Sequence, residues 1–171
     1  TNFKELRASS NKLGDKGLKK LIKFVRHYSK IDFSLVDLSE NSIGIDGTNL
    51  ARELVSIPNL KIHELRLSSN FINSSQFSEI LVAIAQNKSS KLRILNLGIN
   101  LISDDVSSTL KNFINDNSTL EQLYLDGNNI KIEDSVLIDL QKSMESKSVL
   151  KILSLYKNQI TSRDNSVRLR C

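Results

Sequence analysis

The sequence predicts a repeat protein of the α/β class, in which short strands alternate with helices. One spacing recurs along the chain: apolar-x-x-apolar-x-apolar-x-x-Asn-x-apolar. It occurs as FKELRASSNKL, FSLVDLSENSI, IHELRLSSNFI, LRILNLGINLI, LEQLYLDGNNI and LKILSLYKNQI. The asparagines of this spacing follow one another at steps of 30, 29, 30, 28 and 30 residues. Between these strings, apolar residues recur at helical spacing. Six asparagines in the same apolar frame do not arise by chance, so the repeat defines the architecture.

Each string predicts a strand that ends in a turn. In the string from Leu120 to Ile130, alternate side chains of a strand face opposite ways. Leu123 and Leu125 therefore point inward and Tyr124 points outward. Asn128 falls where the strand ends. Its amide has donor and acceptor groups that can satisfy backbone groups at a turn.

The repeated asparagines are expected to have a structural role. Stacked in register, they would form a ladder of hydrogen bonds along the turns, and we assign no chemistry to them. The ladder residues are Asn11, Asn41, Asn70, Asn100, Asn128 and Asn158.

The chain resembles the leucine-rich-repeat family over nearly its full length. The repeat length of 28–30 residues and the apolar spacing are similar to the ribonuclease-inhibitor-like subclass. This resemblance implies a solenoid shaped as a horseshoe arc, with a parallel sheet on the concave face and helices on the convex face. A single domain, 1–171, would hold about six repeats. Their approximate ranges are 1–30, 31–59, 60–89, 90–117, 118–147 and, as a partial repeat, 148–171.

In chain order, each strand contributes an inward pair of residues and each helix a buried stripe. The inward strand pairs are Leu6 and Ala8, Val36 and Leu38, Leu65 and Leu67, Leu95 and Leu97, Leu123 and Leu125, and Leu153 and Leu155. The helix stripes are Leu18, Leu21, Ile22 and Val25; Leu50, Ala51, Leu54 and Val55; Phe77, Ile80, Leu81 and Ile84; Leu110, Phe113 and Ile114; and Val136, Leu137, Leu140 and Met144.

Some positions depart from this regular pattern. Pro58 is expected to end the second helix, because its ring cannot continue one. In the fifth helix, Ile138 competes with the stripe for the inward side. Ala8 is small, so the first repeat should have a thinner core. The tail after Ile160 is too short and too polar for a repeat helix, and neither end shows a recognisable cap. We therefore expect a fragment of a longer protein, or ends that are covered by a partner or a modest local cap.

Composition and charge limit the classes of function. The net charge is +5, but acidic and basic residues are interspersed, so no nucleic acid partner is expected. The nearest basic cluster is Arg163, Arg168 and Arg170 in the tail. Cys171 is the only cysteine, which excludes an intrachain disulfide and favours a reducing, cytoplasmic compartment. No apolar run approaches the roughly 18 residues of a membrane span.

No constellation of residues points to catalysis. His27 and His63 belong to different repeats, and no metal-binding, phosphate-binding or nucleophile motif is present. We therefore expect no enzyme activity, no metal and no cofactor.

The outward strand residues form the candidate site. The first repeats present serine with alternating charges, whereas the last three present apolar and aromatic residues beside polar ones, as protein-binding hot spots do. The alternative is that these residues are there because strands favour them. The candidate partner-binding residues on the concave face are Arg66, Ile94, Asn96, Ile99, Tyr124, Asp126, Ile152, Tyr156 and Lys157.

The sequence thus predicts a non-enzymatic module that binds another protein, of unknown identity and in an unknown oligomeric state. Its repeats are similar to those of ribonuclease inhibitor, of the sensor halves of NOD-like receptors, and of leucine-rich effectors that bacteria inject into the host cytosol. An intracellular receptor, a regulator or a bacterial effector would each fit. The alternative is a GTPase-activating protein of the leucine-rich-repeat type, such as the activator of Ran, but the acidic extension of that protein has no counterpart in this chain.

Overall fold

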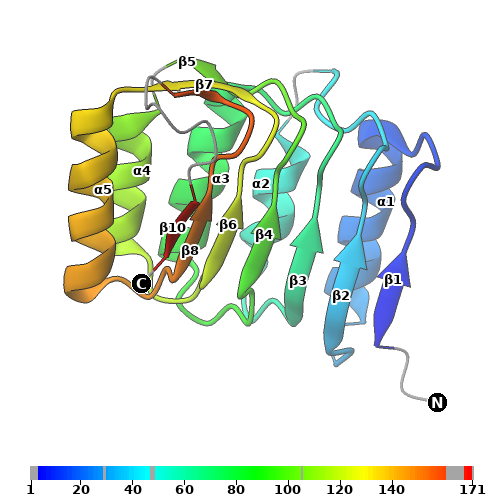
Figure 1. The fold of residues 1–171 in the computed structure, drawn as a ribbon. Coiled ribbons are helices and arrows are strands. Elements are labelled where there is room, and N and C mark those ends of the chain that lie inside the picture. The colour runs from blue at the N-terminus through cyan, green and yellow to red at the C-terminus, as the bar shows by residue number, and fades with distance from the viewer. Residues whose placement is uncertain (1–3, 29, 47–48, 105, 161–167, 171) are drawn as a thin grey trace.

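The computed structural model describes residues 4–28, 30–46, 49–104, 106–160 and 168–170. Strands and helices alternate along the chain (Figure 1). The strands of the main sheet are β1 (Glu5–Arg7), β2 (Phe33–Asp37), β3 (Ile62–Arg66), β4 (Ile94–Asn96), β6 (Gln122–Tyr124), β8 (Ile152–Ser154) and β10 (Arg168–Arg170). The helices are α1 (Gly14–His27), α2 (Leu50–Val55), α3 (Ser74–Gln86), α4 (Ser107–Asp116) and α5 (Asp134–Lys147). A small second sheet contains β5 (Ser103–Asp104), β7 (Asn129–Ile132) and β9 (Gln159–Ile160).

The main sheet is parallel from β1 to β8, in the order β1-β2-β3-β4-β6-β8-β10. Its register places one leucine or valine of each strand opposite the next. This interior line consists of Leu6, Val36, Leu65, Leu95, Leu123 and Leu153. All except Leu6, on the edge strand, have an exposed fraction of 0%. The predicted α/β arrangement with a mainly parallel sheet is confirmed, and its strands share one aliphatic interior.

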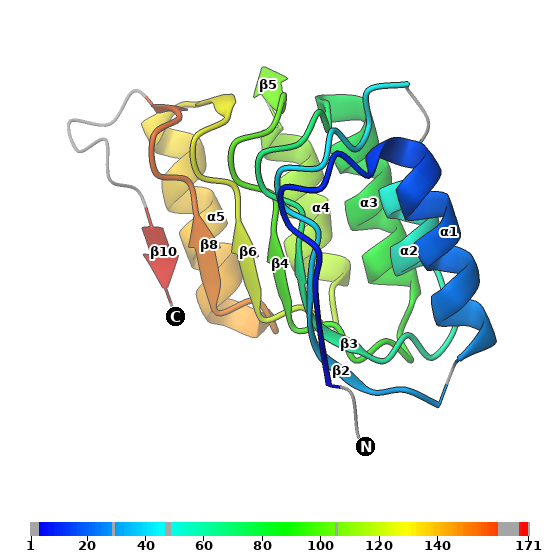
Figure 2. The same ribbon diagram turned by 90° about the vertical axis from the view of Figure 1, so that its right-hand side faces the viewer.

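The helices lie on one side of the main sheet, as Figures 1 and 2 show, and the opposite side is left open. The predicted stripes of α2, α3 and α4 are buried or half-buried against the sheet. In α5, Leu140 and Met144 are buried while Ile138 is 55% exposed, which settles the rotation of that helix. The second helix ends at Val55, before Pro58. We call the uncovered side of the sheet the open face.

The repeated asparagines connect neighbouring turns. Asn70 Oδ1 accepts the Asn41 and Ile43 N–H groups at 3.1 and 2.9 Å, while its Nδ2 donates to Leu38 and Leu67 oxygens. Similar side-chain bonds to the turn of the preceding repeat are made by Asn41, Asn100, Asn128 and Asn158. The side chain of Asn11, at the exposed edge, bonds only within its own turn among the described bonds, to the Ser9 oxygen. These bonds fix the position of each turn, along the strand direction, relative to the turn of the neighbouring repeat. They thereby help to fix which side chains of neighbouring strands lie side by side on the open face.

The residue just before each ladder asparagine has a left-handed backbone. The φ angles lie between 52° and 67°, and one of the six residues is glycine. The column consists of Ser10, Glu40, Ser69, Ile99, Gly127 and Lys157. L-residues other than glycine, Asn and Asp rarely adopt this conformation, and a β-branched residue is the least suited to it. Ile99 is therefore the residue of this column whose type is least suited to its backbone conformation.

At the C-terminal end, where the sequence shows no recognisable cap, a short strand lies beside β8, which fits the modest local cap that was one of the alternatives. β10 pairs antiparallel with β8, and Leu169, opposite Leu153, is buried. The tail is too polar for a repeat helix, but its single leucine suffices to extend the interior line by one strand. Arg168 and Arg170 belong to this strand, and Arg163 lies outside the described residues.

Candidate interaction surface

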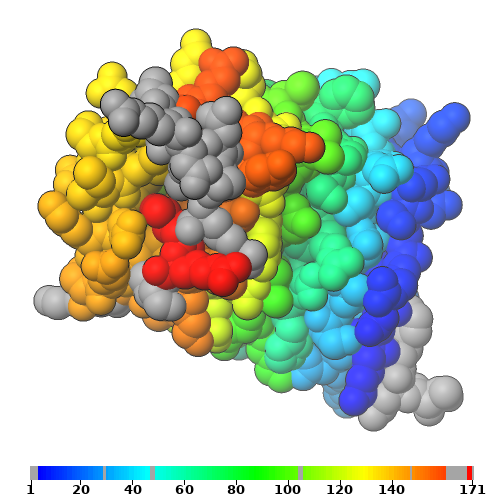
Figure 3. Space-filling model, viewed as in Figure 1, coloured from blue at the N-terminus to red at the C-terminus, as the bar shows by residue number. Residues whose placement is uncertain are grey.

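The open face is built from columns of side chains that the register sets side by side. One column consists of Glu5, Leu35, Glu64, Ile94, Gln122 and Ile152, and the next of Arg7, Asp37, Arg66, Asn96, Tyr124 and Ser154. Figure 3 shows this face, with the strands side by side from the blue N-terminal end to the red C-terminal end. Not every outward residue is accessible, because Leu35 and Ser154 are buried by their surroundings.

The part of the open face on β1, β2 and β3, which we call the polar half, has side chains bonded to one another. Arg7 Nε lies 2.9 Å from Glu5 Oε2. Arg66 Nε lies 2.6 Å from Glu64 Oε1, and its NH1 lies 3.9 Å from an Asp37 carboxylate oxygen. Beyond the strand ends, Ser10 donates to Glu40 and Ser68 donates to Ser39. Arg66, a predicted partner-binding residue, is thus held between two carboxylates.

The part on β4, β6 and β8, with the turns that follow them, we call the apolar half. Ile94 and Ile152 are half-buried, on either side of Gln122. Tyr124 is also half-buried, and its hydroxyl donates to Gln122 Oε1 at 2.7 Å. Asn96 lies beside it in the register. The sheet therefore brings four predicted residues together on neighbouring strands, each half-buried: Ile94, Asn96, Tyr124 and Ile152.

Ile99 is the most exposed of the predicted apolar and aromatic residues, at 62%. Its left-handed backbone turns the side chain towards the next turn, where a Cβ added to Gly127 would lie 3.1 Å from Ile99 Cγ1. Because Gly127 has no side chain, it leaves room for the Ile99 side chain. The repeated turn imposes the left-handed backbone on Ile99, although a β-branched residue is poorly suited to it.

Tyr156 and Lys157 form the other projecting group. Tyr156 is 47% exposed, and Lys157 Nζ lies 5.4 Å from the centre of its ring. Asp126 Oδ1 accepts the Tyr156 N–H at 2.9 Å and the Ser154 hydroxyl at 2.6 Å. Asp126, a predicted partner-binding residue, thus bonds to the turn that carries Tyr156, and its contact with a partner stays a prediction.

Two residues that the sequence analysis did not select belong with this group. Phe71 is 39% exposed and Leu101 is 54% exposed, each directly after a ladder asparagine. Leu101 N–H donates to the Ile72 oxygen, which places the two turns side by side. The signal was available, because Phe71 and Leu101 occupy equivalent positions of neighbouring repeats. We call Phe71, Ile99, Leu101 and Tyr156 the apolar rim.

A hollow of about 450 Å³ lies in the middle of the open face. Polar side chains make up most of its wall, and Arg66, Asn96 and Tyr124 line it together with Ile94. The hollow extends from the polar half into the apolar half. A bound segment that fills it would reach both.

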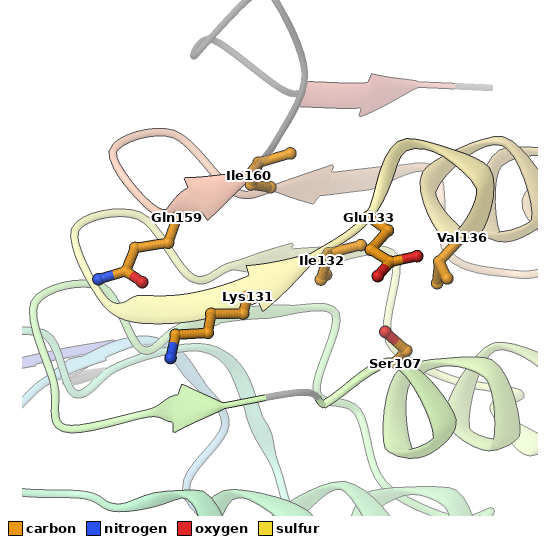
Figure 4. A pocket seen from close by; sticks show the side chains of 7 residues that line it. All are labelled: Ser107, Lys131, Ile132, Glu133, Val136, Gln159 and Ile160. Atoms are coloured by element: carbon orange, nitrogen blue, oxygen red, sulfur yellow. The ribbon is translucent and has the colours of Figure 1, made fainter.

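Two other hollows were considered. Figure 4 shows the larger, of about 640 Å³, lined by residues that include Ser107, Lys131 and Glu133. Its wall ends at Ile160, beside residues 161–167, which the structure does not describe. The other, of about 400 Å³, lies between α3 and α4 and is lined partly by Val82 and Phe113. The hollow between α3 and α4 is an alternative candidate interaction site, on the helical side of the main sheet.

Across the described residues, no group of three or more His, Cys, Asp or Glu side chains is arranged to hold a metal ion. His63 Nε2 instead lies 2.8 Å from Asp32 Oδ1, and Lys91 also contacts that carboxylate. Among the described helices, none is long and apolar enough to cross a membrane.

Comparisons with known proteins point to leucine-rich repeats. The chain is 34% identical over 91 residues to the NACHT, LRR and PYD domains-containing protein 14 of Mus musculus. The match covers 53% of this chain and 9% of that protein, so the chain spans a small part of its relative. No protein-family profile matches. Together with the recurring strand, turn and helix, this similarity supports a leucine-rich-repeat family for the chain.

Among solved structures, internalin C2 of Listeria monocytogenes gives a TM-score of 0.36 with 19% identity. The alignment covers 94% of this chain and 74% of that one. A TM-score and an identity of this size do not establish a shared fold, so no conclusion is based on this likeness.

Proposed function

We propose that the protein is a non-enzymatic protein–protein interaction module. Its open face would be the concave wall of a ribonuclease-inhibitor-like solenoid, and a partner protein would bind the apolar half and the apolar rim. The observation that carries this proposal is Ile99, an aliphatic side chain that is 62% exposed at a turn position which the other five repeats fill with polar residues or glycine. Apolar side chains exposed beside polar ones are typical of surfaces that bind another protein.

The chemistry of the surface favours a protein as the ligand. Aromatic and aliphatic side chains at the centre of a polar surround are typical of protein interfaces. Tyr124 and Tyr156 each keep a polar tip beside an apolar ring, and Lys157 provides a charge at the border. The hollow is too open and too polar to enclose a small apolar ligand, whereas a side chain of a partner could enter it.

The biological setting follows from the same proposal. An intracellular receptor or regulator in a reducing compartment fits the similarity to a NACHT, LRR and PYD protein and the single cysteine. The GTPase-activating alternative would require stimulation of GTP hydrolysis by this chain, and an assay with candidate GTPases separates the two.

The experiment begins with a photo-crosslinking phenylalanine analogue at position 156 and, separately, at position 138 on α5. The expected result is a specific crosslinked protein from position 156 alone. Binding of that purified protein is then measured with the double variant Ile99→Ala, Tyr156→Ala, for which we expect at least about tenfold weaker affinity, or about 1.4 kcal/mol.

The matched control is Val82→Ala with Ile138→Ala, since those side chains are 54% and 55% exposed on the helical side. It should bind as tightly as the unaltered chain. An affinity that depends on the control pair and not on Ile99 and Tyr156 would move the site to the helices and contradict the proposal.

A further inference from the structure

The hollow in the middle of the open face carries an excess of negative charge. Its wall contains three carboxylates, those of Asp37, Glu40 and Glu64, and one cation, the guanidinium of Arg66. Three carboxylates against one guanidinium leave a net charge of −2, whereas the whole chain has a net charge of +5. The hollow is therefore opposite in sign to the molecule around it.

The bonds within this wall leave the excess charge uncompensated. Arg66 Nε donates to Glu64 Oε1 at 2.6 Å, and its NH1 lies 3.9 Å from Asp37 Oδ2. Arg7, which is beside Asp37 in the register, is bonded to Glu5. The other described donors to the carboxylates of the wall are a hydroxyl and a backbone N–H, which are uncharged. The hydrogen bonds of the wall thus form without a ligand, but its charges do not balance.

Two of the carboxylates are partly withdrawn from water. The side chain of Asp37 is 13% exposed and that of Glu64 is 24% exposed. A charge with less water around it interacts more strongly with an opposite charge, because the effective dielectric constant is lower. A concave wall of one sign also concentrates the electric field inside it. A cation that enters the hollow is therefore attracted more strongly than one that meets a fully hydrated surface carboxylate.

The opposite wall suits the apolar part of a basic side chain. Tyr124 and Ile94 line it, and both are half-buried. The strands β3, β4 and β6 are consecutive in the sheet, so the two walls lie about two strand spacings, or roughly 10 Å, apart. Arginine and lysine pack an apolar stem on apolar surface and keep the charge at a polar end. The face of an aromatic ring attracts the same cations.

We infer that the partner protein places an arginine or lysine side chain in this hollow. Its charged end lies between Asp37 and Glu64, and its stem lies against Tyr124. This contact rests on the proposed function and adds the chemistry of the partner to it, since the hollow continues into the apolar half that the partner covers. A partner carboxylate directed at Arg66 would instead meet three groups of its own sign, which selects against an acidic residue.

A small probe tests the hollow without the partner. The chain is titrated with N-acetyl-arginine methylamide, or with the uncharged N-acetyl-citrulline methylamide, and the backbone amide shifts are followed by NMR. Capped arginine should give saturable shifts at Glu64, Arg66 and Tyr124, with a dissociation constant in the millimolar range. Capped citrulline should bind at least about tenfold more weakly. Equal binding of the two probes, or no saturable shift at these residues, would overturn the inference.

Neutralising the carboxylates tests their part in the contact. The double variant Asp37→Asn, Glu64→Gln keeps an acceptor oxygen for each bond described above, so the fold should be unchanged in circular dichroism. It should weaken the binding of capped arginine and of the crosslinked partner at least about tenfold. The matched control is Glu53→Gln with Glu79→Gln on α2 and α3, which changes the net charge equally and also removes ion pairs with arginine. The control should bind both as the unaltered chain does.

Arg66→Gln should have an effect of the opposite sign. It removes the cation that competes for the two carboxylates, so capped arginine should bind at least about threefold more tightly. If Arg66→Gln weakens the partner and the carboxylate double variant strengthens it, an acidic group enters the hollow and the inference is wrong.

The contact in the hollow and the proposed function can fail separately. If Ile99→Ala with Tyr156→Ala weakens the partner but Asp37→Asn with Glu64→Gln does not, the open face remains the interface and the basic side chain is excluded. If neither pair of substitutions changes the affinity, the proposed function fails as well.

Discussion

The polar half and the apolar half of the open face rest on the same interior line, but their side chains are used differently. In the polar half, Arg7, Arg66 and their carboxylate neighbours bond to one another, so the surface is satisfied in the absence of any ligand. In the apolar half and rim, Ile99 and Tyr156 are 62% and 47% exposed. Exposed ion pairs contribute little to stability or to binding, whereas apolar area removed from water contributes about 25 cal/mol per Å².

One scaffold therefore carries side by side a surface whose charges pair with one another and a surface with exposed apolar residues. The ladder asparagines and the left-handed column are the same in both halves. What changes is the side chain placed on that backbone. Function would then be set by a few outward positions whose mutation leaves the fold intact, and the following predictions separate the shared support from those positions.

The largest effect is expected from the shared support. Leu95→Ala should lower the free energy of unfolding by about 2–5 kcal/mol, since Leu95 is fully buried in the middle of the interior line. Leu6→Ala, on the half-buried edge strand, should cost less. Urea denaturation of both variants measures this. A loss below about 1 kcal/mol for Leu95→Ala would contradict the assignment of the interior line to the hydrophobic core.

The next effect concerns the ladder. Asn100→Ala should cost about 1–3 kcal/mol, because Ile72 N–H and the Leu67 and Leu97 oxygens lose their buried partner. Asn11→Ala is the matched control at the exposed edge and should cost a fraction of that. Equal losses in thermal or urea denaturation would show that the ladder bonds add nothing beyond the local turn.

A smaller effect distinguishes the halves at equivalent backbone positions. Ile99→Asn should raise the free energy of unfolding by up to about 1 kcal/mol, because asparagine tolerates a positive φ better than a β-branched residue. The same change should weaken the partner. Ser69→Asn, at φ 54° in the polar half, should alter neither. If Ile99→Asn destabilises the chain, Ile99 is a packing residue and not a strained binding residue.

The smallest effects come from two aspartates outside the open face. Burial raises the pKa of Asp15 above its ordinary 3.8, although the Gly44 and Asp46 N–H groups partly oppose the shift. The hydrogen bond from Lys91, and then that from His63, lower the pKa of Asp32. Stability linked to Asp15 is therefore lost as the pH rises from 3.8 through its raised pKa. Stability linked to Asp32 is present above 3.8 and lost as the pH falls through its lowered pKa.

Carboxyl-carbon NMR titration measures both shifts. Lys91→Met should return the pKa of Asp32 towards 3.8 and leave that of Asp15 raised. The affinity of the apolar half for its partner should not change as either aspartate titrates, since neither aspartate belongs to the open face. A pKa of Asp32 that Lys91→Met leaves low would assign the shift to another cause.

The sequence predicted the interior line, the helix stripes and the outward columns because each follows from a strict period of apolar residues. It could not predict the left-handed column, since Ile99 and Glu40 are poor residues for that conformation and the turn imposes it on them. The capping box that Gln76 forms with Asn73 at the start of α3 was likewise not predicted. The strand at β10 was missed because three residues are too few to show a period.

The candidate site was predicted unevenly for the same reason. Ile99 and Tyr156 were selected correctly as outward positions, although their role in binding stays a prediction. Asp126 and Arg66 were predicted to bind a partner, which stays a prediction, and the structure shows that both also bond to neighbouring residues. Phe71 and Leu101 directly follow ladder asparagines and were not among the outward residues selected. Sequence spacing predicts whether a side chain points towards the interior or outward. How exposed an outward side chain is depends on how much of it the neighbouring turn covers.

Hydroxyl-radical footprinting with and without the crosslinked partner tests the central claim most directly, because it reports side-chain exposure residue by residue. In the free chain, Phe71, Ile99 and Tyr156 should be modified rapidly and Leu123 should not. The account expects the partner to protect the apolar rim and to leave Val82 and Ile138 as reactive as before. Protection of Val82 and Ile138 with an unprotected rim would contradict it.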